Sequence, residues 1–357
     1  MKNVKASLAL LLVLCLLLGG CTAENREQET LTKFSGGFFE AFDTYTTLIG
    51  YARDQNTFDE AFDAVKEMFL HYHRIYDGYH AYEGINNLYY VNRHAAQGPV
   101  KAEPELIELL LWLRQVQPQL RGRMNVAMGA VLQLWHEYRE EGVALPDMES
   151  LRACAQHTDF DSVVIDEDAG TVYFADPELQ LDLGAVAKGY TVEIVASWLL
   201  TSSMPSYIIS AGGNVRCGEK PRDGRARWGV GIQDPADVGI AGNGSNKDVL
   251  YLNGLSVVTS GDYQRYYVVD GVRYHHLIDP DTLMPGGEMR SVTIVTRDSG
   301  WADALSTAVF LLPYEEGRAF VDSLEDVEAY WVLNDGSVRF TEGLKAMLGS
   351  QGASGRD

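Results

Sequence analysis

Two side chains that could hold a divalent cation lie one helical turn apart in an otherwise apolar segment. Asp303 and Thr307 are four residues apart in Trp301-Ala302-Asp303-Ala304-Leu305-Ser306-Thr307. On a helix their carboxylate and hydroxyl share one face. Hard divalent cations such as Mg²⁺ take oxygen ligands of this kind. A helix-capping Asp followed by a Thr in the core is the alternative, and the spacing alone leaves both open.

A lysine in an unusual position indicates an anion site. Lys188 follows Asp182-Leu183-Gly184-Ala185, where a predicted strand runs into a helix. N–H groups at a helix N-terminus favour anions, and the helix dipole normally places acidic side chains there. An anionic ligand would explain the lysine, whereas a solvated surface lysine is the alternative.

Paired glycines and paired histidines follow two other predicted strands. Gly212 and Gly213 would let the backbone approach a phosphate or a ring closely, although a simple turn is the alternative. His275 and His276 offer a general base near neutral pH, although a core or surface histidine is the commoner case. Because neighbouring strand residues point to opposite faces, we expect only one of the two histidines to face a site and the other to face away from it.

These groups depend on helices and strands to bring them together. Helical spacing predicts a helical N-terminal part, with helices over 57–76, 104–112 and 129–138, and later helices over 185–200 and 301–312. Strands are predicted over 162–166, 171–174, 181–183, 206–210, 250–252, 256–259, 266–269, 272–274 and 291–295. The order predicts one compact α+β domain with a mixed β-sheet core and helices. No GxGxxG follows a first strand, which argues against a Rossmann domain.

The first residues predict export and a lipid anchor. Lys2 and Lys5 precede an apolar run from Ala6 to Leu18, which is shorter than the roughly 20 residues of a membrane-spanning helix. Cys21 follows Gly19-Gly20 in the form of a bacterial lipobox. The alternative is an ordinary signal peptide with a chance cysteine. A lipidated Cys21 would hold the protein at the extracytoplasmic face of the cell membrane.

Net charge and cysteine content argue against several classes of partner and of site. The net charge is −21, which argues against nucleic acid or anionic lipid as a partner because both are polyanions. An anionic substrate therefore needs a locally positive site or a bound cation. Beyond Cys15 and Cys21 the chain has only Cys154 and Cys217, which favours two isolated thiols over a single bridge and gives no metal-type spacing.

Six blocks in order give the chain its resemblance to a known family. It resembles the FAD:protein FMN transferase (ApbE) family in Leu181–Ala185 with Lys188-Gly189-Tyr190, Ala211–Asn214, Trp228–Pro235, Thr259–Tyr263, His276–Pro280 and Ala302–Thr307. Each block alone is weak, but their order and spacing together are specific. It departs from the family pattern at Asn125 and Ala127, where Asp and Thr are usual, and at Leu283, where Gly is usual. We expect a signal peptide over 1–20, a lipidated tether over 21–33 and an ApbE-like flavin transferase domain over 34–349.

The resemblance implies a set of roles. FMN would pass from FAD to a Ser or Thr hydroxyl of an acceptor flavoprotein in a membrane redox complex, with release of AMP. His276 looks like the catalytic histidine of the family. Mg²⁺ would be held by Ala185, Asp303 and Thr307, with Ser306 close by. The implied FAD contacts are Phe42, Tyr82, Arg123, Met124, Asn125, Asp182, Lys188, Gly212, Gly213 and His276.

Three rival functions follow from the same residues. If water replaces the acceptor hydroxyl, the enzyme is an FAD pyrophosphatase that releases FMN and AMP. A lipoprotein that only binds flavin is a second rival, and it would need neither a base nor the Asp303 and Thr307 pair. A solute-binding lipoprotein is disfavoured because two Rossmann-like lobes would show repeated βα units.

Overall fold

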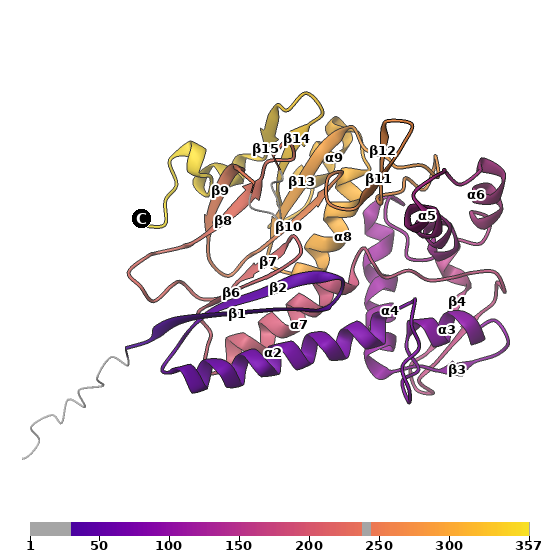
Figure 1. Cartoon of the computed structure of the whole chain (residues 1–357), viewed down its shortest axis with the longest axis horizontal. Coiled ribbons are helices and arrows are strands. Elements are labelled where there is room, and N and C mark those ends of the chain that lie inside the picture. The colour runs from indigo at the N-terminus through magenta and orange to yellow at the C-terminus, as the bar shows by residue number, and fades with distance from the viewer. Residues whose placement is uncertain (1–29, 238–243, 357) are drawn as a thin grey trace, which may run out of the picture. The chain divides into compact units, whose positions relative to one another are not determined.

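An eight-stranded antiparallel sheet runs through the part of the chain that the structure describes (Figure 1). The structure is a computed structural model, and it describes residues 30–237 and 244–356. One compact unit spans Thr32–Asp357. The predicted signal peptide and Cys21 lie outside the described residues. The strand order is β1-β2-β6-β7-β10-β13-β14-β15.

The central strands of this sheet are largely buried. Their bounds are β1 (Thr32–Ala41), β2 (Thr44–Ala52), β6 (Tyr207–Ala211), β7 (Asn214–Cys217), β10 (Ser256–Gly261), β13 (Met289–Thr296), β14 (Glu328–Leu333) and β15 (Val338–Phe340). Seven of the eight residues of β13 are buried, including Val292, Ile294 and Val295. Consecutive residues of β13 are buried, so both faces of this strand are covered.

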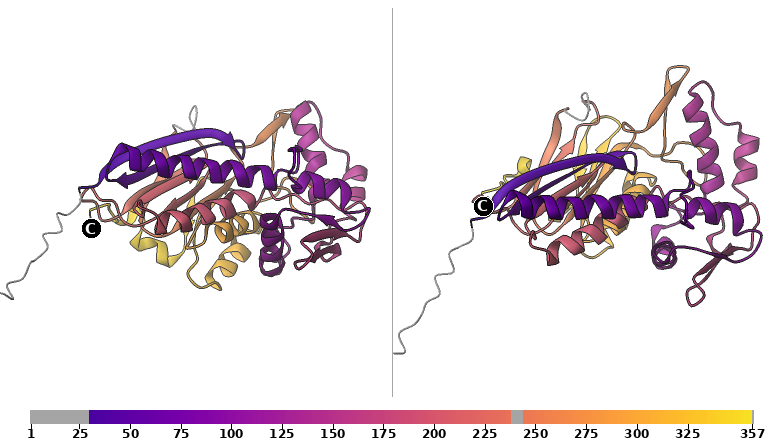
Figure 2. Two further views of the ribbon diagram at one scale, coloured as in Figure 1. Left: turned by 90° about the horizontal axis from the view of Figure 1, so that it is seen from below. Right: turned by 60° about the horizontal axis from the view of Figure 1, so that its bottom comes forward.

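Three helices pack against the sheet. They are α2 (Gln55–Tyr76), α7 (Ala187–Thr201) and α8 (Ser299–Phe310), and Figures 1 and 2 show α2 along the β1–β2 hairpin with α7 beside it. Asp54 caps α2 by accepting from the Thr57 N–H, and Asp298 caps α8 by accepting from the Trp301 N–H. Helix α8 is buried along nearly its whole length, because it contacts α7, β10 and β13.

The remaining elements form smaller layers around this core. The helices are α3 (Leu88–His94), α4 (Pro104–Val116), α5 (Gly129–Glu141), α6 (Met148–Cys154) and α9 (Tyr314–Asp322). The small sheets comprise β3 (Val100–Lys101), β4 (Val163–Asp166), β5 (Thr171–Phe174), β8 (Trp228–Gln233), β9 (Asn246–Leu252), β11 (Tyr266–Val269) and β12 (Val272–His275). Cys154 and Cys217 are free thiols, as the spacing predicted. Among the described residues, no helix is long and apolar enough to cross a membrane.

The α+β class is confirmed, but three details of the prediction are wrong. The N-terminal part opens with the β1–β2 hairpin before any helix, and Thr32-Lys33 of the predicted tether already belong to β1. Every ladder of the large sheet is antiparallel rather than mixed.

The segment 181–183 forms no strand. The Asn92 side chain accepts from the Leu181 N–H and donates to its carbonyl, and the Asp182 N–H donates to the Val126 carbonyl. A side chain and a loop therefore satisfy the backbone groups that a strand partner would otherwise take.

Candidate active site

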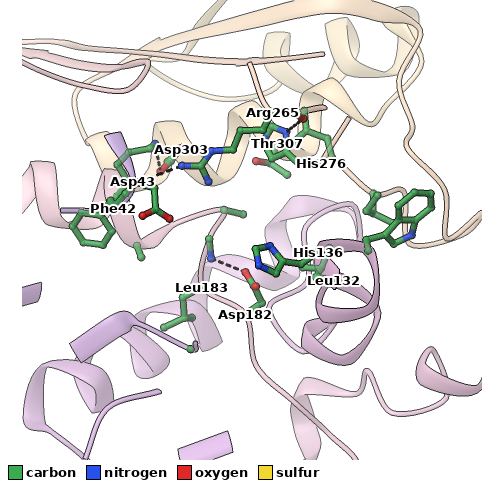
Figure 3. Close-up of a pocket in the computed structure, with 18 of the residues that line it drawn as sticks. Phe42, Asp43, Leu132, His136, Asp182, Leu183, Arg265, His276, Asp303 and Thr307 are labelled. Atoms are coloured by element: carbon green, nitrogen blue, oxygen red, sulfur yellow. Dashed lines mark hydrogen bonds and ion pairs between the residues drawn. The ribbon is translucent and has the colours of Figure 1, made fainter. Parts of the chain in front are cut away.

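One cavity of about 1230 Å³ brings the predicted site together. It is lined by the β1–β2 turn, the loop before α7, the ends of β6 and β10, the β11–β12 hairpin, and parts of α5 and α8. Figure 3 shows Asp303, Thr307, Arg265 and His276 on one side and Asp182 and His136 on the other. The predicted residues that line it are Phe42, Tyr82, Arg123, Met124, Asn125, Asp182, Ala185, Lys188, Gly212, Gly213, His276, Asp303 and Thr307.

The carboxylate of Asp303, a residue of α8, contacts two donors in the first turn of α7. Its Oδ2 accepts from the Gly189 N–H at 2.8 Å and lies 3.4 Å from the Lys188 ammonium. Helices α7 and α8 approach so closely here that a Cβ on Gly189 would lie 2.5 Å from the Asp303 Cβ. Burial lowers the pKa of Lys188, and the Asp303 carboxylate opposes that shift. The Lys188 side chain is mostly buried in the cavity wall, and its Nζ contacts Asp303 and the Asn214 amide oxygen.

The cavity offers three oxygens that suit a hard divalent ion. Asp303 and Thr307 face the same cavity from one side of α8, as their spacing predicted, and Ala185 lines it from the opposite loop. In a continuing helix the Gly189 N–H would bond to the Ala185 carbonyl four residues earlier. Here it donates to Asp303 instead, which leaves that carbonyl available. A carboxylate, a hydroxyl and a carbonyl form the all-oxygen set that Mg²⁺ takes, with water completing the shell.

Ser306 does not join this set. Its hydroxyl is fully buried, lies 2.8 Å from the Ser260 hydroxyl and donates to the Asp303 carbonyl at 2.9 Å. The side chain thus ties α8 to β10. In the described part of the chain, no group of three or more His, Cys, Asp or Glu side chains could hold a metal.

The hydrogen bonds of the two histidines assign them different chemistry. The His276 Nδ1 lies 3.2 Å from the Arg265 carbonyl, which can only accept, so Nδ1 carries the hydrogen. The Nε2 atom of a neutral His276 is therefore a free base. The His275 Nδ1 accepts from the Leu277 N–H at 3.2 Å, so its Nε2 carries the hydrogen. Of the two side chains, only His276 can accept a proton through Nε2.

The expectation that His275 faces away from the site is wrong, because both histidines line the cavity. Strand β12 ends at His275, and the chain then turns so that the Gly286 N–H donates to the Leu277 carbonyl. Strand alternation does not extend across that turn. Burial, together with the charge of Arg265, lowers the pKa of His276 to about 3, and burial also lowers the pKa of His275. His276 is therefore neutral at physiological pH.

Several residues that were predicted to contact FAD are hydrogen-bonded to other groups of the protein. Asp182 accepts from the Gly184 N–H at 2.7 Å and from the Tyr79 hydroxyl at 3.2 Å. Tyr82 donates to Asp77 at 2.9 Å, and burial, assisted by Asp77, raises the pKa of Tyr82 to about 12. These bonds fix the side chains in place before a ligand arrives.

Arg123 and Asn125 hold the loop before α5. Arg123 Nη1 lies 3.1 Å from Asp279 and 2.6 Å from Asp281, so it joins that loop to the segment after His276. The amide of Asn125 donates to the Thr158 carbonyl and accepts from the Ala127 N–H, which occupies it structurally. Met124 is buried beneath them. Of the three, Arg123 is the residue with a charge to offer a ligand.

Three non-glycine residues in or near the site have a left-handed backbone conformation. Phe42 has φ 53° and Asp43 has φ 50°, so they make the two-residue turn between β1 and β2. Leu283, where the family usually has Gly, has φ 62°. Such a conformation costs about 1–2 kcal/mol per residue. The Leu283 carbonyl accepts from Trp135 Nε1 at 2.9 Å inside an apolar cluster, and this packing offsets the strain.

Gly212 and Gly213 form a tight turn, which was the alternative interpretation of the pair, and they also line the cavity. Their φ values are 51° and 96°, as a tight β6–β7 connection requires. A Cβ on Gly212 would lie 2.0 Å from the Thr44 hydroxyl, so only glycine fits against the β1–β2 turn.

Sequence reasoning missed two of the positive groups of the cavity, Arg139 and Arg265. Arg265 donates to the Phe42 carbonyl at 3.3 Å, and Arg139 lies 2.6 Å from His136. The charged lining comprises Arg123, Arg139, Lys188 and Arg265 against Asp43, Asp77, Asp182 and Asp303. The cavity is thus balanced in charge, although the chain carries −21. Arg265 follows the Thr259–Tyr263 block by two residues, which was its only signal.

The comparisons with known proteins agree on one family. Residues 42–331 match the model of the ApbE family. The FAD:protein FMN transferases of Klebsiella pneumoniae and Treponema pallidum are 33% and 34% identical to this chain. They cover 68% and 71% of this chain, and the matches span 73% and 72% of those proteins. The ApbE protein of Thermotoga maritima has a TM-score of 0.78 at 27% identity, covering 88% of this chain and 98% of its own.

A second solved structure extends the likeness of fold. The flavin transferase ApbE of Vibrio cholerae has a TM-score of 0.72 at 23% identity and covers 89% of this chain and 99% of its own. The ApbE-like α+β fold that the sequence predicted is therefore confirmed.

Proposed function

This chain belongs to the ApbE family, and we propose that it is an FAD:protein FMN transferase that uses Mg²⁺ and His276. The activity follows from its relatives, which are FAD:protein FMN transferases. The observation that carries the mechanism is one cavity that holds both the Asp303 oxygen set and a histidine whose Nε2 is free to accept a proton.

The reaction assigns a task to each side of the cavity. The acceptor hydroxyl loses its proton to His276 Nε2 while its oxygen attacks the FMN phosphorus of FAD. The bond from that phosphorus to the AMP oxygen breaks, and AMP leaves. Lys188 and the N-terminus of α7 place positive charge where the pyrophosphate lies. In this arrangement the protein mainly positions two substrates and stabilises charge.

The metal has a defined place in this scheme. Asp303, Thr307 and the Ala185 carbonyl would hold Mg²⁺, and Ser306 supports Asp303 from behind. When bound, the ion neutralises phosphate charge during phosphoryl transfer. The Lys188 ammonium lies 3.4 Å from the Asp303 carboxylate, which would also hold the metal. Lys188 would therefore lie beside the phosphates of FAD that the metal neutralises.

The rival reaction, hydrolysis of FAD by water, gives the same AMP. We therefore expect AMP release from FAD to rise when a flavin-free acceptor protein is added, with one FMN bound covalently for each additional AMP. AMP is measured by chromatography and bound FMN by in-gel fluorescence. AMP release that is independent of the acceptor, with all FMN free in solution, would identify a pyrophosphatase instead.

We further propose that the enzyme is lipid-anchored through Cys21 at the extracytoplasmic face, and that its acceptor belongs to a membrane redox complex. The lipobox form of Leu18-Gly19-Gly20-Cys21 supports the anchor. Cys21→Ser is expected to remove the acyl groups and move the protein from the membrane fraction to the soluble one, because the acyl chains supply the membrane affinity. Fractionation and mass spectrometry of the mature N-terminus measure this. Cys154→Ser, in α6, should stay with the membranes. A wild-type chain without acyl groups would contradict the proposal.

A further inference from the structure

Large apolar side chains are exposed on the two hairpins that flank the cavity. The described residues expose nine large hydrophobic side chains, and five of them lie on these hairpins. They are Phe39 and Tyr45 of β1–β2, and Tyr266, Val268 and Val272 of β11–β12. We call these five residues the apolar rim. Apolar side chains gathered in this way mark interaction sites.

The first half of the apolar rim sits beside the Phe42-Asp43 turn. Phe39 is 69% exposed and its ring lies 4.4 Å from that of Tyr45, measured between centroids. The register of β1 shifts between Phe38 and Ala41, so two consecutive residues, Phe39 and Glu40, are exposed between the buried Phe38 and Ala41. A β-bulge next to an active site commonly redirects a side chain in this manner.

The second half belongs to a hairpin that leads directly to His276. Strands β11 and β12 pair only with each other among the described strands, and Figure 2 shows the hairpin standing out from the body of the protein. Its inner residues Tyr267 and Tyr274 belong to the cluster around Trp135. Tyr266 and Val268 are exposed. The two halves of the rim are linked by the hydrogen bond from Arg265, next to Tyr266, to the Phe42 carbonyl.

We propose that the apolar rim is the docking surface for the folded acceptor protein, through an apolar patch that surrounds its Ser or Thr. The inference rests on the proposed function, because that function brings a protein hydroxyl to His276. The rim adjoins the cavity, since other residues of both hairpins, such as Phe42 and Tyr267, line it. An apolar contact between the rim and the acceptor does not require the acceptor to carry a charge opposite to the net charge of −21 of this chain.

A membrane is the other surface that could cover the rim, and the position of Thr32 disfavours it. Thr32 begins β1, whereas Phe39 lies near the far end of this ten-residue strand. At about 3.3 Å per residue, that strand spans roughly 30 Å. The rim therefore lies at the opposite end of β1 from the residue to which the proposed tether connects.

The test needs an acceptor as its probe. The wild-type enzyme labels one from native membranes with flavin, the fluorescent band is identified by mass spectrometry, and the same protein is then produced without flavin. Val268→Ser/Val272→Ser and, separately, Phe39→Ser are expected to raise the KM for this acceptor about tenfold, with the affinity for FAD unchanged. Val164→Ser, an exposed valine of β4 outside the rim, is the matched control and should keep the wild-type KM.

Each result has a distinct meaning. An unchanged KM in both rim variants, with labelling by the wild type intact, would overturn the docking surface and leave the proposed function standing. Weaker binding of the rim variants to phosphatidylcholine–phosphatidylglycerol vesicles, with no change in KM, would assign the rim to lipid instead and overturn the proposal. If the wild type labels no protein at all while it cleaves FAD, the proposed function fails and the rim proposal fails with it.

Discussion

His276→Ala is expected to slow FMN transfer by about 10²–10⁴-fold, which is the usual contribution of a positioned general base. FAD should still bind, because many other residues line the cavity. The physical reason is the Nδ1 contact to the Arg265 carbonyl, which leaves Nε2 of His276 unprotonated and free. Single-turnover labelling of a flavin-free acceptor measures the rate, and quenching of flavin fluorescence measures the binding.

His275→Ala is the matched control. His275 lines the same cavity, but its Nδ1 accepts from the Leu277 N–H, so we expect transfer close to the wild-type rate. Equal losses in the two variants, or a loss confined to His275→Ala, would contradict the assignment of the base.

The pH dependence provides a second readout for the same residue. A base with a pKa of about 3 in the free enzyme is deprotonated at neutral pH, and it becomes protonated only as the pH falls toward 3. Between pH 5 and 8 the kcat/KM of the wild type should therefore show no ascending limb that belongs to His276. A limb near pH 6.5 that disappears in His276→Ala would show that the histidine titrates at its ordinary pKa.

Asp303→Asn is expected to reduce Mg²⁺-dependent transfer by about 10³-fold or more, because several kcal/mol of charge stabilisation depend on the metal. Asparagine keeps the size of the side chain and an oxygen that can accept from the Gly189 N–H, so the contact between α7 and α8 should survive. Calorimetric titration with Mg²⁺ measures the loss of metal binding independently of activity.

Ser306→Ala is the control for the metal. Its hydroxyl is already paired with Ser260 and with the Asp303 carbonyl, so the variant should still bind Mg²⁺. Full activity of Asp303→Asn with EDTA present would refute the metal site.

The parts of the site that were predictable are those encoded by local spacing. Asp303 and Thr307 share a helix face because they are four residues apart, and Lys188 is adjacent to the start of its helix. The β1–β2 hairpin was missed because its strands include Gly36, Gly37 and Gly50, which favour no regular element by themselves. Gly36 and Gly50 fit there because Phe62 and Met204 pack against them, which only the folded chain shows.

Other features arise only from long-range contacts. Arg265 was missed because its partner Phe42 lies 223 residues earlier in the chain. The resemblance placed Ser306 near the metal, yet its hydroxyl is paired with Ser260 of β10, a residue 46 positions earlier in the chain. The tautomers of His275 and His276 depend on backbone groups that no sequence pattern positions.

Mass spectrometry of an acceptor protein after incubation with FAD, Mg²⁺ and this enzyme tests the central claim most directly. The account predicts an FMN-sized mass increment on a single Ser or Thr with the wild type, little or none within the same time with His276→Ala, and none when Mg²⁺ is removed. An acceptor that stays unmodified while FAD is cleaved to free FMN and AMP would contradict it.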